Sequence, residues 1–212
     1  MDGVSGPPPH VPFPSGLRRL SRGDTPQSPG SRREAILDAA LELFRQRGFH
    51  SVGIDEIGTT AGISGPGVYR HFPSKSSLLV ALFDSITERT LVAAQEIQKA
   101  DADPAEILDR LVAHQVGQAV AERAVLAVWV QDCRSLPPPD QQRIRSRQVE
   151  YIAIWVATLL RVRPELGQTE AEAVVHAALG AVNSVAIYDT ALPAPALETL
   201  LEAAARAVLR TA

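Results

Sequence analysis

The sequence has few of the residues that build several common classes of protein. Its 212 residues include one cysteine, Cys133, so neither an internal disulfide nor a multi-cysteine zinc site can form. Aromatic residues make up only 5% of the chain. The longest apolar run, Ala124–Val130, has seven residues, whereas a membrane-spanning helix needs ~18. The N-terminus also lacks the apolar core of a secretion signal. These absences favour a soluble, cytoplasmic protein that does not enter a membrane.

The net charge is small, but the charged residues are unevenly distributed along the chain. The formal net charge is −3. Residues 16–75 carry nine basic against six acidic side chains, whereas residues 76–212 carry twelve against seventeen. A basic front and an acidic rear are expected if the front binds a polyanion.

The first 30 residues hold seven prolines and five glycines. Such a stretch cannot bury enough apolar area to offset the cost of ordering it, so we expect a disordered arm over residues 1–30. Its basic residues could lie along phosphates or in a minor groove. The alternative, a solvated tail without a role, stays open. These basic residues are Arg18, Arg19 and Arg22.

From Ser31 onward, apolar residues recur at helical spacing, and no alternating strand pattern or repeat is found. We therefore expect an all-α chain of about nine helices, with Ser31 capping the first. Their expected positions are residues 31–47, 54–61, 65–72, 75–100, 105–121, 123–134, 140–163, 169–190 and 195–209.

Two of these short helices, joined by a turn at residues 62–64, fit a helix-turn-helix. Ser64 can cap the second of them by accepting from its free backbone N–H groups. Gly65, Pro66 and Gly67 leave the start of that helix almost without side chains, so it can approach a base edge or a phosphate. A helix of about eight residues is too short to be stable alone, so its neighbours must hold it.

The outward side chains of this helix would then be free to recognise DNA. Tyr69 can donate its hydroxyl, Arg70 can bind a guanine edge or a phosphate, and His71 can donate to a phosphate. Lys75 opens the next helix, where a phosphate could bind. Taken singly, these residues could equally be half-buried or ordinary surface. The whole cluster, with its turn and caps, favours a surface that faces DNA.

The stretch "GFHSVGIDEIGTTAGISGPGVYRHFPSKSSLL", residues 48–79, resembles the N-terminal signature of the TetR (tetracycline-repressor) family of bacterial transcriptional regulators. The shared pieces are the Gly-Phe pair, the Ala-Gly-Ile-Ser turn, the Tyr-x-His-Phe of the recognition helix and the Ser-Lys-x-x-Leu-Leu of the fourth helix. The resemblance implies that Tyr69, His71 and Lys75 touch DNA, and that Ser64 and Gly65 lie against the groove.

The sequence departs from the family pattern at several positions. Pro66 and Gly67 stand where Gly-Thr or Gly-Ala is usual, Gly58 replaces the usual alanine of the second helix, and Val52 replaces a frequent threonine. Fewer side chains are left to read bases. The backbone, Tyr69 and Arg70 must then carry more of the recognition, which makes the operator sequence hard to foresee but leaves DNA binding as the expectation.

One helix-turn-helix reads only a short half-site, and two-fold dimers place two recognition helices about one turn of DNA apart. Each of the last two expected helices carries an apolar stripe, and the resemblance implies a homodimer formed through these helices. The alternative is that both stripes face the protomer's own core. The residues predicted for dimerisation are Val175, Leu179, Val182, Leu197, Leu201 and Val208.

The resemblance implies that the middle helices enclose a cavity for a small effector, and the apolar character of the residues there favours a lipophilic or acyl-type one. Such a cavity needs apolar walls and a few placed polar groups. The candidates for lining it are His114, Gln118, Trp129, Cys133, Tyr151 and Trp155. We thus divide the chain into an arm (1–30), a DNA-binding domain (31–76) and an effector-binding and dimerisation domain (77–212).

An enzyme is the main alternative from another class. The five histidines are scattered, and neither a metal-binding His-Glu-x-x-His pair nor a Gly-x-Ser-x-Gly motif is present. We therefore expect no catalytic residue, metal or cofactor. A second alternative is a helical ligand-binding or interaction protein with a degenerate DNA-binding head, and a third is a regulator that activates instead of repressing.

Overall fold

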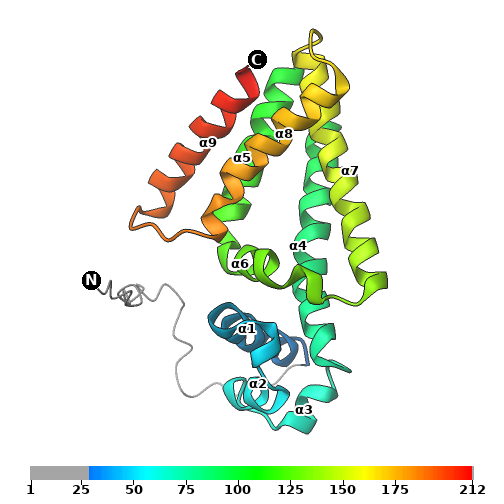
Figure 1. Cartoon of the computed structure of the whole chain (residues 1–212), viewed down its shortest axis with the longest axis vertical. Helices are drawn as coiled ribbons and strands as arrows, with labels where there is room; N and C mark the ends of the chain where they lie inside the picture. The colour runs from blue at the N-terminus through cyan, green and yellow to red at the C-terminus, as the bar shows by residue number, and fades with distance from the viewer. Residues whose placement is uncertain (1–28, 212) are drawn as a thin grey trace, which may run out of the picture.

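The computed structural model describes residues 29–211, and nine α-helices with three short 3-10 helices account for their regular structure (Figure 1). The described residues contain no strand, which confirms the all-α prediction. None of these helices combines the length and the hydropathy that crossing a bilayer requires.

The N-terminal part of the fold is a small helical domain at the bottom of Figure 1. Its core is apolar and includes Ile36, Phe44, Ile57 and Val68, each fully buried. Gly48 permits the sharp turn after the first helix because its φ of 78° is left-handed. The elements of this domain are α1 (Pro29–Arg47), η1 (Phe49–Ser51), α2 (Ile54–Thr60) and α3 (Gly65–Tyr69).

Helix α4 (Lys75–Gln98) leads from this domain into the upper part of the molecule, where α7 runs beside it (Figure 1). Helices α5, α8 and α9 pack on one another on the opposite side, and α6 lies between the two parts. The upper elements are α5 (Pro104–Ala121), α6 (Arg123–Asp132), η2 (Cys133–Ser135), α7 (Pro138–Val162), α8 (Gln168–Asn183), η3 (Ser184–Ala186) and α9 (Ala194–Arg210).

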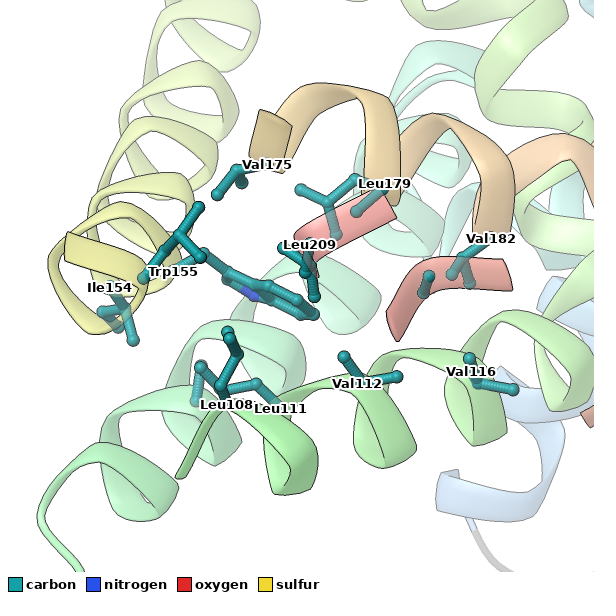
Figure 2. Close-up of a cluster of buried hydrophobic side chains, with 14 of the residues drawn as sticks. Leu108, Leu111, Val112, Val116, Ile154, Trp155, Val175, Leu179, Val182 and Leu209 are labelled. Carbon is teal, nitrogen blue, oxygen red and sulfur yellow. The ribbon is translucent and has the colours of Figure 1, made fainter. Parts of the chain in front are cut away.

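The upper core is built around Trp155, which is 1% exposed (Figure 2). Leucine and valine side chains from α5, α8 and α9 surround its indole. Among the described residues, its Nε1 is the one buried side-chain donor or acceptor without a hydrogen-bond partner. Packing alone therefore holds the indole. The cost of burying its unpaired N–H offsets part of the free energy that this packing contributes.

Helix α4 belongs to both cores. Leu82, Phe83 and Ile86 pack in the lower core, whereas Leu91 and Ala94 pack in the upper one. The change from one core to the other thus falls between residues 86 and 91, well beyond residue 76. The division of the chain at residues 76 and 77 stays a prediction.

Several predicted helix ends were wrong. Helix α1 begins at Pro29 instead of being capped by Ser31, so the last two residues of the predicted arm are helical. Residues 1–28, with Arg18, Arg19 and Arg22, lie outside the described residues. Helix α3 ends at Tyr69, three residues early, and α8 ends at Asn183 and continues only as a short 3-10 turn.

Candidate DNA interface and effector cavity

Residues 64–71, from the turn after α2 to just beyond the end of α3, present a small polar surface to solvent, which we call the tip. Ser64 caps α3, and its hydroxyl accepts from the backbone N–H of Gly67 at 3.3 Å. Val68 is fully buried beneath the helix, whereas the Tyr69 side chain is 54% exposed and Arg70 is exposed. The guanidinium of Arg70 has no hydrogen-bond or ion-pair partner within residues 29–211. Packing thus holds α3 in place, while the side chains of Tyr69 and Arg70 remain exposed to solvent.

Two glycines let α2 and α3 approach closely, which gives one of them, Gly65, a role in packing. Gly65 is buried, and a Cβ on it would lie 1.8 Å from Oδ1 of Asp55. A Cβ on Gly58 would lie 3.0 Å from the carbonyl oxygen of Ile63. Gly65 therefore serves the contact between the helices, and its place against a groove stays a prediction. Pro66 is exposed and Gly67 is half-buried, so the open edge of the tip begins there.

His71 lies just beyond the end of α3. Its backbone N–H donates to the carbonyl of Val68 at 2.9 Å, and its side chain is half-buried. The next residue, Phe72, is 2% exposed, and the guanidinium of Arg33 lies 4.8 Å from its ring centroid. His71 therefore stands at the edge of the tip, less open than Tyr69.

Lys75 has a structural role that the sequence did not reveal. Its Nζ donates to the carbonyl oxygens of Phe49 at 2.8 Å and Val52 at 2.9 Å, with a longer contact of 3.4 Å to His50. It also lies 4.4 Å from the centroid of the Phe49 ring. The ammonium therefore closes the end of η1 onto the start of α4. These contacts favour an internal clamp, and the phosphate contact of Lys75 stays a prediction.

Besides the apolar packing of α6 in the lower core, two polar contacts join η1 to α6 and η2. The buried carboxylate of Asp132, at the end of α6, accepts from the backbone N–H of Phe49 at 2.9 Å. In η2, the hydroxyl of Ser135 lies 2.9 Å from Nε2 of His50. A displacement of α6 or η2 would therefore move η1 through these contacts.

Above α6 lies a cavity of about 400 Å³, which we call the inner cavity. Its walls come from α4, α5, α6, α7 and α8. The residues that line it are Ile86, Thr87, Thr90, Gln115, Gln118, Ala119, Val125, Leu126, Trp129, Arg147, Gln148, Tyr151, Ile152, His176, Leu179, Gly180 and Asn183.

A hydrogen-bonded network lines part of this cavity. The Tyr151 hydroxyl donates to Oε1 of Gln115 at 2.7 Å, and Nε2 of Gln115 donates to Oδ1 of Asn183 at 2.9 Å. Burial raises the pKa of the Tyr151 phenol far above its ordinary value, so it stays a donor. Gln118 accepts from the Thr90 hydroxyl at 2.7 Å. The amide N–H groups of Gln118 and Asn183 are left to donate to an occupant.

One cation reaches the inner cavity. Nη1 of Arg147 lies 2.7 Å from Oδ1 of Asp84 on α4, and the same oxygen also accepts from Arg143. The hydrogen bonds that Arg143 donates to the carboxylates of Asp84 and Asp140 raise its pKa above the ordinary value. Since Arg143 holds Asp84 independently, Arg147 could turn toward an anion without leaving that carboxylate unpaired.

Three of the six residues predicted for the effector cavity line it: Gln118, Trp129 and Tyr151. Cys133 lies in a neighbouring cavity. His114 and Trp155 line neither cavity, and Trp155 belongs to the upper core, so their prediction is corrected. Sequence reasoning missed Thr90, Arg147 and Asn183, because their approach depends on the packing of five helices.

The residues predicted for dimerisation pack inside the protomer. Val175, Leu179 and Val182 are at most 8% exposed and face the upper core (Figure 2). Leu197 and Leu201 are also buried, and Val208 packs against the same core. Their burial favours the alternative that both stripes face the protomer's own core, and their part in dimerisation stays a prediction. The exposed faces of α8 and α9 instead carry Ala173, Ala177, Gly180, Leu200, Ala203 and Ala207.

Comparison with known proteins gives the family. Residues 36–82 match the model of bacterial regulatory proteins, tetR family. The transcriptional activator FasR of Mycolicibacterium smegmatis is 36% identical over 72 residues, which span 34% of this chain and 33% of FasR. The transcriptional repressor KstR2 of the same species is 26% identical over 137 residues, which span 64% of this chain and 67% of KstR2.

The solved structures agree on the fold. A TetR-family regulator from Bordetella parapertussis 12822 superposes with a TM-score of 0.77 at 20% sequence identity, over 84% of this chain and 94% of that one. Fold and tip together define a helix-turn-helix protein with a second, helical domain that holds a cavity. The helix-turn-helix domain of the chain is therefore that of the tetR family of bacterial regulatory proteins, and most of the chain has the fold of a solved TetR-family regulator. This match supports the prediction of a transcriptional regulator rather than an enzyme.

Proposed function

We propose that this regulator binds a palindromic operator as a homodimer, represses transcription, and is released by a small effector in the inner cavity. Its place of action is then the cytoplasm, where bacterial DNA lies. Relatives of the chain include both a repressor and an activator. We choose repression because KstR2 matches a larger share of the chain than FasR does.

The exposed tip of α3 is the observation that carries this proposal. Tyr69 and Arg70 stand in solvent beside a capped helix start, on a domain that matches the family model. A guanidinium without an internal partner can bind a guanine edge or a phosphate through two N–H groups. Ser64, Pro66, Gly67 and His71 complete the proposed DNA surface.

The exposed faces of α8 and α9 support the homodimer. Small side chains such as Ala177 and Ala203 let helices approach closely, and Leu200 is 56% exposed. Ile187 and Tyr188, in the connection after α8, extend the apolar surface. Such a surface is typical of a protein interface.

The effector would act through the two contacts at η1. An occupant of the inner cavity touches Trp129 on α6, three residues before Asp132. Movement of α6 would then reach Phe49 through the Asp132 carboxylate. Helix α4, which also lines the cavity, gives a second connection through Lys75. By linkage, effector and operator must weaken each other's binding by the same factor.

The test is fluorescence anisotropy of the full chain with labelled DNA from upstream of its own gene. We expect saturable binding that survives an excess of unrelated duplex and that Arg70→Ala weakens. A head without DNA-binding activity would give equal, weak binding to both duplexes, and the proposal would then be wrong. A reporter gene placed behind the same DNA separates repression from activation.

A further inference from the structure

A second cavity adjoins the inner one. It has a volume of about 530 Å³ and lies where η2 leads into α7, so we call it the outer cavity. The two cavities share two wall residues, Trp129 and Gln148. Any occupant that reaches past these side chains would occupy both.

The outer cavity differs from the inner one in charge. Its wall holds Arg134 and Arg145 and no acidic residue. Both arginines are exposed, and neither guanidinium has a hydrogen-bond or ion-pair partner among residues 29–211. The inner cavity contains one cation, Arg147, which is paired with Asp84. An anionic group would therefore be held in the outer cavity, and an apolar group in the inner one.

The boundary between the cavities also offers hydrogen-bond donors. The indole N–H of Trp129 and the side-chain amide of Gln148 have no hydrogen-bond partner in the described part of the chain. Trp129 is fixed edge-on against Phe83, with 4.9 Å between ring centroids. The Trp129 ring therefore has a fixed position in the wall that the two cavities share. Donors at this point suit an oxygen-bearing link between an apolar body and an anionic head.

We propose that the effector is an amphiphilic anion, whose apolar body fills the inner cavity and whose phosphate or carboxylate lies between Arg134 and Arg145. This rests on the proposed function, because it names the ligand of the same effector site. A guanidinium pair can bind either anion through two N–H groups each. The dianionic phosphate gains more from two cations than the monoanionic carboxylate does.

The position of the head would place it beside the contacts that hold the DNA-binding domain. Arg134 lies in η2, between Asp132, which accepts from Phe49, and Ser135, which contacts His50. A head bound to Arg134 therefore acts on the segment that carries both contacts. The apolar body alone would touch only Trp129 on that route.

The proposal is tested by calorimetric titration of the full chain, without DNA, using 1-octanol, octanoate and octyl phosphate. The three probes share an eight-carbon chain and differ only in the head. We expect octyl phosphate to bind more tightly than octanoate, and octanoate more tightly than octanol. If a single carboxylate is the better fit, octanoate binds most tightly, which still supports an anionic head. Arg134→Gln and Arg145→Gln should each lower the affinity for octyl phosphate about tenfold and leave that for octanol unchanged.

Arg161→Gln is the matched control, because Arg161 is an exposed arginine of α7 that lines neither cavity. It should change none of the three affinities. Equal affinity for octanol and octyl phosphate, or an equal loss for both in Arg134→Gln, would overturn the proposal. So would the absence of binding by all three probes. Operator binding is measured separately by anisotropy, so a failure here would leave the DNA-binding part of the proposed function untouched.

Discussion

Replacing Lys75 by methionine separates a structural clamp from a DNA contact. Methionine keeps an apolar stem over the Phe49 ring but removes the ammonium. Two hydrogen bonds are short, 2.8 Å to Phe49 and 2.9 Å to Val52, and the contact of 3.4 Å to His50 is long. A hydrogen bond to a charged group contributes about 1.5–3 kcal/mol. Because Lys75 is half-buried and water can reach the carbonyls, we expect the free energy of unfolding to fall by about 2 kcal/mol.

The assay is urea unfolding of the full chain followed by circular dichroism, together with anisotropy over a range of salt concentrations. If Lys75 is a clamp, stability falls and the salt dependence of DNA binding is unchanged. If Lys75 contacts a phosphate, stability is unchanged and the slope of log K against log salt falls by about one. That second result would refute our interpretation. Lys99→Met is the control, because Lys99 is exposed and pairs only with Glu96 on the surface, where such pairs contribute about 0–1 kcal/mol.

Four further outcomes are expected. Arg70→Ala should weaken operator binding by about 1–3 kcal/mol and blur sequence preference, and unchanged anisotropy would remove Arg70 from the interface. Asp132→Ala leaves the buried Phe49 N–H without its acceptor, so unfolding should become easier by about 1–3 kcal/mol; a variant as stable as the wild type in urea would contradict this. Gly65→Ala should destabilise the fold by about 1–3 kcal/mol through its overlap with Asp55, and a second change, Asp55→Ala, should recover part of the loss. Burial lowers the pKa of His114, so the unfolded chain takes up its proton first and thermal stability should fall as pH drops below about 6.5; His114→Gln should flatten that fall, and an unaltered pH profile would exclude it.

Local chemistry made the DNA-binding tip predictable. The turn at residues 62–64, the Ser64 cap and the break before α4 depend on residues close in sequence, and the structure has them in place. The helix count and the all-α class followed from periodicity for the same reason. Helix ends were less predictable, because glycine and proline mark only some of them.

Contacts between distant residues could not be read from the sequence. Lys75 is 23 residues from Val52, yet the Val52 carbonyl is one of the groups that hold its ammonium. The apolar stripes of α8 and α9 are visible in the sequence, but their pattern does not show whether they pack in the protomer core or at a dimer interface. In α7, the apolar Val149 is 60% exposed, whereas the polar Thr158 is 1% exposed. Its hydroxyl donates to the carbonyl of Ile154, which explains how it can be buried.

The most direct test of the central claim is a stoichiometric anisotropy titration with a palindromic duplex selected by the protein itself. We expect an end point of two protomers per duplex. We also expect that binding to that duplex is lost when Tyr69 and Arg70 are both replaced by alanine. Full binding by the double variant, or saturation at one protomer per palindrome, would contradict it.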